Sequence, residues 1–224
     1  MPSSRASAGF GPRKAYLIAY NALSAVSWAV LLNRVVGLLL TDGASAVSPA
    51  VERFARITQT FAAMEILHAL TGVVPAPLFT TVMQVASRLV LVWGISHPFP
   101  GLNASPWYSS MLIAWSITEV VRYTFFTLKQ VDAVPEHLEW MRYSGFLVLY
   151  PVGISSEVAM IVRAFLGPAE GLHEYYPWVL AAILVTYIPG SVILYSHMLK
   201  QRRKYIGGAS KPAAAAVRAA KKAQ

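Results

Sequence analysis

The sequence predicts an all-α membrane protein, a bundle of six transmembrane helices with both termini on the cytoplasmic side. Hydrophobic residues make up 56% of the 224 residues and charged residues only 13%, and the mean hydropathy is +0.50. A soluble domain usually carries about 25% charged residues. Apolar runs long enough to cross a bilayer recur along the chain, and basic residues gather at its two ends. These observations together indicate an integral membrane protein.

A transmembrane helix needs about 20 mostly apolar residues, and six stretches meet this need: 15–40, 53–73, 76–96, 107–128, 139–165 and 176–199. Gly and Pro mark the breaks between them, as in "TDGASAVSP" after the first stretch and "SHPFPGLNASP" after the third. The first stretch is too long for a cleavable signal sequence and is expected to remain as a span. The second stretch is the most polar, and its Glu65 and His68 are expected to face the protein interior.

The distribution of basic residues predicts the topology. An even number of spans places both basic termini on one side of the membrane, and the positive-inside rule makes that side the cytoplasm. Lys129 follows the fourth span, whereas Lys and Arg are absent from three other loops, 41–50, 97–106 and 166–175. We therefore expect an N-terminal cytoplasmic tail, a six-helix transmembrane domain and a basic, disordered cytoplasmic tail, over residues 1–14, 15–199 and 200–224.

The last four residues, "KKAQ", place Lys221 and Lys222 at the fourth and third positions from the C-terminus. On a cytoplasmic tail this pattern predicts retrieval to the endoplasmic reticulum. The basic tail beside a span is better explained by topology than by nucleic-acid binding. The chain contains no Cys, which excludes disulfides, thiolate metal sites and a cysteine nucleophile.

Ionisable side chains inside a membrane cost several kcal/mol unless they are paired or line a wet cavity, so each is a candidate site residue. Glu119 and Arg122 lie one turn apart in the fourth span and predict a structural ion pair. Gln84 and Arg88 lie one turn apart in the third span, and either orient a substrate or hold the fold. Arg142 begins the fifth span, where it either snorkels to the interface or binds a substrate.

Three polar residues of the fifth span, Tyr143, Tyr150 and Glu157, follow one another at intervals of seven. Seven residues make nearly two helical turns, so the three side chains lie within about 40° of one stripe. Tyr150 and Glu157 would be separated by roughly 10 Å along an ideal helix, and a kink at Pro151 is expected to bring them closer. A buried carboxyl group can give and take protons near neutrality, which favours a catalytic pair over the alternative of a structural one.

Several stretches in order resemble one family: "YLIAYNALSAVSW", "MEILHALTGVVPAP", "QVASRLVLVWGI", "AWSITEVVRYTFF", "MRYSGFLVLYPVGISSE" and "YIPGSVILYSHMLKQRRK". The family is that of the (3R)-3-hydroxyacyl-CoA dehydratases of very-long-chain fatty-acid elongation, also described as protein-tyrosine-phosphatase-like A proteins. The resemblance covers nearly all of residues 13–205, and plant members look especially similar.

The resemblance implies a hydro-lyase with six spans in the endoplasmic reticulum membrane, a catalytic Tyr150 and Glu157, and no metal or organic cofactor. It also implies partners in fatty-acid elongation, namely the condensing enzyme and the ketoacyl and enoyl reductases. The family carries a Tyr and a Glu seven residues apart around a Tyr-Pro step, and this chain matches that pattern without departure. A single "EILH" unit falls short of the paired carboxylate motifs that hold di-iron sites, so no metal is expected.

The implied reaction removes water from a 3-hydroxyacyl-CoA to give the trans-2-enoyl-CoA, and it needs a base for the C2 proton and an acid for the C3 hydroxyl. Glu157 is expected to be the principal acid/base and Tyr150 to hydrogen-bond the substrate, although the sequence leaves the reverse assignment open. Arg142, Tyr143, Arg88 and Gln84 are the candidate substrate-binding residues. The alternative function is a non-catalytic membrane scaffold or transport protein of the elongase complex.

Overall fold

The computed structural model describes residues 11–167 and 171–222, with side chains as far as Ile206. Its helices are α1 (Pro12–Thr41), α2 (Ala44–Phe61), α3 (Ala63–Leu70), α4 (Leu78–Leu89), the π-helix η1 (Val90–Ser96), the 3₁₀-helix η2 (Pro100–Ala104), α5 (Pro106–Lys129), α6 (Glu136–Ser144), α7 (Phe146–Phe165) and α8 (Tyr176–Lys222). No strand occurs within these two ranges, so the predicted all-α class is confirmed.

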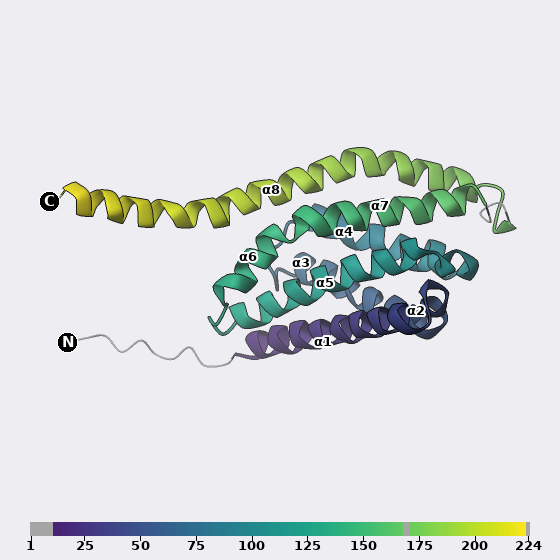
Figure 1. Ribbon diagram of the computed structural model, residues 1–224, viewed down its shortest axis with the longest axis horizontal. Coiled ribbons are helices and arrows are strands. Elements are labelled where there is room, and N and C mark those ends of the chain that lie inside the picture. Colours follow the sequence, from purple (N-terminus) through teal and green to yellow (C-terminus); the bar gives the residue numbers. More distant parts are fainter. Residues whose placement is uncertain (1–10, 168–170, 223–224) are drawn as a thin grey trace.

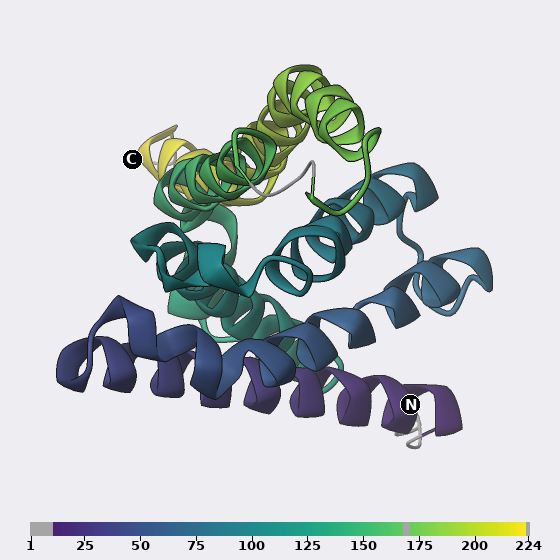
Figure 2. The same cartoon turned by 90° about the vertical axis from the view of Figure 1, so that its right-hand side faces the viewer.

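The helices form one bundle in which α5 is central. Figure 2 shows α5 between the α1–α2 pair on one side and the α7–α8 pair on the other, and its most extensive contacts are with α1 and α7. In Figure 1, α1 begins and α8 ends at the same end of the bundle, and α8 runs on past that end. Helices therefore travel back and forth along the bundle, as in a polytopic membrane protein.

Four helical segments are long and apolar enough to cross a membrane: Pro12–Thr41, Leu78–Ser96, Phe146–Phe165 and Tyr176–Ile206. They correspond to the first, third, fifth and sixth predicted spans. The predicted fourth span is α5, which has 24 residues but carries Glu119 and Arg122 in its middle. The predicted second span is divided between α2 and α3.

Three predicted boundaries were wrong. One expected loop is a tight turn, and two stretches expected to be continuous helices are each interrupted at one residue. The loop expected over 41–50 ends at Gly43, whose φ of 82° completes the turn, so that α2 begins at once with Ala44. The span expected over 53–73 is interrupted at Ala62, whose N–H bonds to the carbonyl of Gln59, three residues back.

The span expected over 139–165 is interrupted at Gly145, which separates α6 from α7. A Cβ at this position would lie 2.8 Å from the carbonyl oxygen of Met141, so the local backbone requires glycine. Helix α7 then continues through Pro151 as a single helix. Because the interruption lies between Tyr143 and Tyr150, the continuous stripe of three polar residues predicted from their spacing does not form.

The apolar core lies where α1, α5 and α7 meet. It is built from side chains that share one face of each helix, at spacings of one, three or four residues, namely Trp28, Leu31 and Val35 of α1, Met111, Leu112 and Trp115 of α5, and Met160, Ile161 and Ala164 of α7. As far as Ile206, helix α8 adds one fully buried side chain, Leu180, and exposes large apolar residues, including Trp178, Val185, Ile188 and Val192. Helix α8 is thus an outer helix of the bundle.

The start of α8 is fixed to η1 by Tyr176, whose hydroxyl donates to the carbonyl oxygen of Gly94. A Cβ on Gly94 would lie 2.9 Å from that hydroxyl oxygen, so the contact depends on the absence of a side chain.

The π-helical backbone of η1 continues α4 to a length that can cross a membrane.

A chain of ion pairs joins α3, α4 and α5 inside the bundle. Arg122 of α5 donates from both terminal nitrogens to the carboxylate of Glu65 on α3, at 2.7 and 2.6 Å, and from Nε to Glu119 at 2.6 Å. Arg88 of α4 donates to the other oxygen of Glu119. Tyr123 adds a 2.5 Å hydrogen bond to Glu65. The expectation that Glu65 and His68 face the interior is met, since Glu65 is partly buried in this chain and His68 is buried beside it.

Replacing Arg122 by Leu should lower the stability of the protein markedly. The change leaves Glu65 without a cation and Glu119 with Arg88 alone, and breaking such a buried pair costs about 3–5 kcal/mol. Arg122→Lys should be intermediate, because an ammonium keeps the charge but cannot donate to Glu65 in a bidentate fork. The melting temperature of purified protein in detergent measures the effect.

The matched control is Arg163→Leu, at an exposed position near the end of α7. This variant should melt close to the wild type. Equal melting temperatures for the Arg122→Leu variant and the wild type would show that the ion pairs do not stabilise the bundle.

Candidate active site

Glu157 lies in the fourth turn of α7, where α7 packs between α5 and α8. One turn earlier, Gly153 lies against Ala114 of α5, and a Cβ on Gly153 would be 3.7 Å from the Cβ of Ala114. The adjacent Ser156 places its hydroxyl 2.9 Å from that of Ser110. Small residues on this side of α7 thus allow close approach to α5 and bring the carboxyl group of Glu157 among side chains of its neighbours.

Both carboxyl oxygens of Glu157 accept hydrogen bonds, each from a different helix. The indole N–H of Trp115 on α5 donates to Oε1 at 2.8 Å. The hydroxyl of Tyr187 on α8 donates to Oε2 at 3.0 Å. Glu157 is partly buried. Because its two hydrogen bonds come from α5 and α8, these helices determine the orientation of the carboxyl group together with α7.

Tyr150 lies on the same side of α7 as Glu157, since seven residues bring two side chains to within about 20° of each other. Its hydroxyl donates a hydrogen bond to the backbone carbonyl of Ser191 on α8, at 3.2 Å, rather than to Glu157. Its ring lies 5.7 Å from the ring of Tyr195. The two residues of the predicted pair thus both face α8, about two turns apart along α7, and each has its own partner there.

Arg88 connects this site with the ion-pair chain. Its guanidinium carbon lies 5.2 Å from the centre of the Trp115 ring while the group is paired with Glu119. Trp115 in turn donates to Glu157. Of the four predicted substrate-binding residues, Arg88 is thus the one that contacts a partner of Glu157.

The other three lie elsewhere. Tyr143 is on α6, where its ring stacks on Tyr205 at 4.5 Å between centroids. Arg142, also on α6, has its guanidinium carbon 5.8 Å from the ring of Phe126. Gln84 is exposed on α4. The structure therefore brings Tyr150, Glu157 and Arg88 to one region and leaves Arg142, Tyr143 and Gln84 outside it.

Sequence reasoning missed Trp115 and Tyr187. A signal for Tyr187 was present in the sequence, because Tyr187, Ser191 and Tyr195 recur every four residues and so share one face of the last helix. Trp115 lies four residues before Glu119 and shares its face of α5 in the same way. Neither spacing identifies Glu157 as the partner, because that contact depends on how three helices pack.

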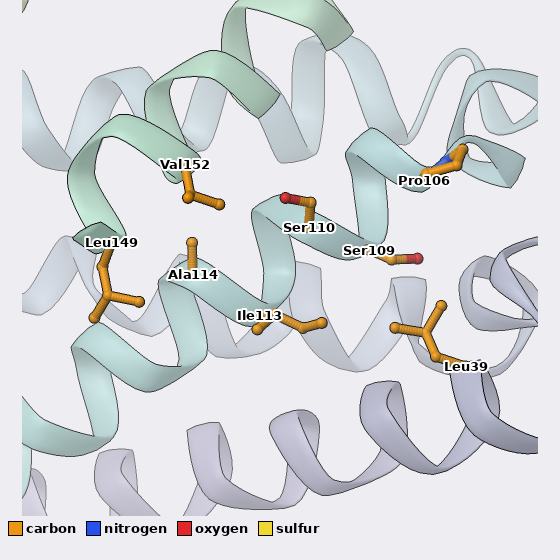
Figure 3. A pocket seen from close by; sticks show the side chains of 8 residues that line it. All are labelled: Leu39, Pro106, Ser109, Ser110, Ile113, Ala114, Leu149 and Val152. Carbon is orange, nitrogen blue, oxygen red and sulfur yellow. The ribbon is translucent and has the colours of Figure 1, made fainter.

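An apolar groove of about 290 Å³ opens between α5, α7 and the end of α1. Figure 3 shows the residues that line it, including Ile113 and Ala114 of α5 and Leu149 and Val152 of α7. Tyr150 and Glu157 are not among them, so neither member of the predicted pair lines the groove. In the part of the chain that is described, no three His, Cys, Asp or Glu side chains cluster as a metal site.

Comparison with known proteins shows the family to which the chain belongs. Residues 59–208 match the sequence profile of the protein tyrosine phosphatase-like protein family, PTPLA. The chain is 40% identical to the very-long-chain (3R)-3-hydroxyacyl-CoA dehydratase PASTICCINO 2A of Oryza sativa over 219 residues, which cover 91% of this chain and 98% of the relative. It is 40% identical to a probable dehydratase of the same kind from Schizosaccharomyces pombe, covering 84% of this chain and 91% of the relative.

The human very-long-chain (3R)-3-hydroxyacyl-CoA dehydratase 2 is 35% identical over 86% of this chain and 81% of its own length. No solved structure matches the chain. These relatives of the chain are named very-long-chain (3R)-3-hydroxyacyl-CoA dehydratases. The predicted resemblance is confirmed, and the chain belongs to the PTPLA family.

Proposed function

We propose that the protein is a hydro-lyase of fatty-acid elongation that converts very-long-chain (3R)-3-hydroxyacyl-CoA to trans-2-enoyl-CoA, with Tyr150 and Glu157 as the catalytic pair. The 40% identity to a dehydratase over 98% of that relative's length carries the assignment of the activity. The placement of the pair is supported by the geometry of α7, where both side chains lie on the face toward α8 and the carboxyl group of Glu157 is held at both oxygens.

In this mechanism Glu157 is the principal acid/base group. Its carboxylate accepts the C2 proton, which the thioester makes acidic, and the electron pair of the broken C–H bond forms the C2–C3 double bond. The C3–O bond breaks, and the leaving hydroxyl takes a proton from Tyr150 and departs as water. Transfer of the proton from Glu157 back to Tyr150 then restores the resting enzyme, so the reaction is balanced without a cofactor.

The substrate would enter from the end of the bundle at which α1 begins and α8 leaves (Figure 1). Lys129 ends α5 and Arg142 lies on α6 near this end, where their charges would attract the phosphates of CoA. From there the acyl chain would run along the bundle toward Tyr150 and then Glu157. A very long chain is poorly accommodated in water, which gives a physical reason for building the site within a membrane protein.

We also propose that α2–α3 and α5 complete a set of six passes, with both termini on the cytoplasmic side of the endoplasmic reticulum membrane. The shared end of α1 and α8 in Figure 1 supports an even number of passes. Arg122 pairs with Glu119 and with Glu65 inside the bundle. This pairing supports the placement of these charged helices within the membrane. Lys221 and Lys222 would then act as a retrieval signal, and the other elongation enzymes would be neighbours in the same membrane.

Loss of the acid/base groups should abolish turnover without unfolding the protein. Tyr150→Phe and Glu157→Gln keep the shape of each side chain but remove the proton that it exchanges, so each should lower kcat by about 100-fold or more. The measurement is conversion of a long-chain 3-hydroxyacyl-CoA by protein purified in detergent. Glu174→Gln and Tyr175→Phe, in the exposed segment before α8, are matched controls that should keep full activity.

A folded wild type that gives no turnover would instead favour the non-catalytic scaffold or transport protein. A wild type that is active together with active Tyr150→Phe and Glu157→Gln variants would retain the dehydratase and reject this pair.

The topology can be tested directly because the chain has no Cys of its own. Single cysteines placed at the exposed positions Ala133, Gly101 and Gly171 each report one loop. In sealed endoplasmic reticulum vesicles, an impermeant maleimide should label Ala133→Cys, whereas Gly101→Cys and Gly171→Cys should react only after the membrane is opened. Labelling of all three in sealed vesicles would contradict the six-pass arrangement.

A further inference from the structure

The two hydrogen bonds on Glu157 are chemically unequal. An indole N–H can only donate, so Oε1, which faces Trp115 at 2.8 Å, is an acceptor in every protonation state of the carboxyl group. A phenol hydroxyl can donate or accept, so Tyr187 at 3.0 Å from Oε2 can hydrogen-bond both the carboxylate and the carboxylic acid. When Glu157 carries a proton, that proton therefore belongs on Oε2, beside Tyr187.

Helix α8 presents a series of groups to α7. Tyr187 faces Glu157, the carbonyl of Ser191 accepts from Tyr150, and the ring of Tyr195 packs on that of Phe146 at 5.6 Å. The hydroxyl of Tyr150 is occupied by Ser191, so the phenol in contact with the carboxyl group is that of Tyr187.

We propose that Tyr187 is a positioning residue for the acid/base group, holding Oε2 of Glu157 as the oxygen that exchanges protons while Trp115 holds Oε1. Three helices then meet at one carboxyl group, with α7 supplying it and α5 and α8 fixing its plane. This inference rests on the proposed dehydratase function and adds to it which oxygen of Glu157 works and which side chains aim it.

The first test is Tyr187→Phe, which removes one hydroxyl and keeps the ring. Misplacing a catalytic group by about 1 Å can cost on the order of 100-fold in rate, so kcat should fall by roughly 10- to 100-fold. KM should change little, because Tyr187 acts through Glu157 rather than by binding substrate. The pH profile of kcat should also shift, since a partner of the titrating carboxyl group has been removed.

The matched control is Tyr176→Phe, which removes a hydroxyl of the same helix from its hydrogen bond to Gly94. This variant should lose thermal stability while keeping the kcat and the pH profile of the wild type. A Tyr187→Phe variant that behaves in the same way would show that Tyr187 only fastens α8 to the bundle, and the proposal would be overturned.

Two further variants make the test specific to Glu157. In a Glu157→Gln background, Tyr187→Phe should cause no additional loss of residual activity, because residues that act as a unit are not additive. Trp115→Phe removes the donor on Oε1 and should lower kcat as Tyr187→Phe does. If Tyr187→Phe does not fold, Trp115→Phe decides the matter, and an unchanged kcat there would overturn the proposal.

The outcomes separate this inference from the proposed function. An active wild type, an inactive Glu157→Gln variant and a fully active Tyr187→Phe variant would keep the dehydratase and reject the positioning role. An inactive folded wild type would reject both.

Discussion

A positive charge inside an apolar bundle must be matched at short range, and Arg122 meets this requirement with two carboxylates from different helices. The guanidinium is planar and has donors on three nitrogens, so its partners must lie in particular directions. Glu65 accepts from both terminal nitrogens of Arg122, and Glu119 accepts from its Nε. The bidentate contact with Glu65 fixes the position of α3 relative to α5. Arg88 adds α4 by pairing with the remaining oxygen of Glu119. The relative positions of three helices thus depend on two arginines, Arg122 between α3 and α5 and Arg88 between α4 and α5.

The same ion pairs reach Glu157 through one aromatic ring. The guanidinium of Arg88 lies near the face of Trp115, a contact that attracts a cation. The edge of that indole carries the N–H that binds Glu157. Trp115 therefore contacts Arg88 of the ion pairs on one side and the carboxyl group of Glu157 on the other. Packing errors in α3 or α4 can in this way alter the orientation of Glu157 without any contact to it.

Much of this architecture could be predicted from the sequence, because hydrophobic runs and basic ends are properties of single segments. The all-α class, the interior position of Glu65 and the pairing of residues one turn apart, such as Glu119 with Arg122, depend on local spacing. The interruption at Gly145 could not be predicted, since it depends on how close the local backbone comes to the carbonyl oxygen of Met141, which leaves no room for a Cβ. That one residue removed Tyr143 from the expected stripe. The partners of Glu157 were equally hidden, because Trp115 and Tyr187 lie 42 and 30 residues away in the chain.

Helix α8 is held to the bundle by hydrogen bonds more than by buried apolar side chains. Its outward side is apolar, and of its side chains up to Ile206 only Leu180 is fully buried. Its hydrogen bonds with α7 run through Tyr187 and the carbonyl of Ser191. In a bilayer, an apolar helix surface is as well accommodated by lipid as by protein, so its burial gives little driving force for helix association. Hydrogen bonds and close packing then determine whether the helix stays against the bundle. Hydrocarbon cannot compete for the α7–α8 contact, but a molecule bearing its own hydroxyl can. A hydroxylated acyl chain is such a molecule, so the substrate itself carries the group that can replace the bonds between these two helices.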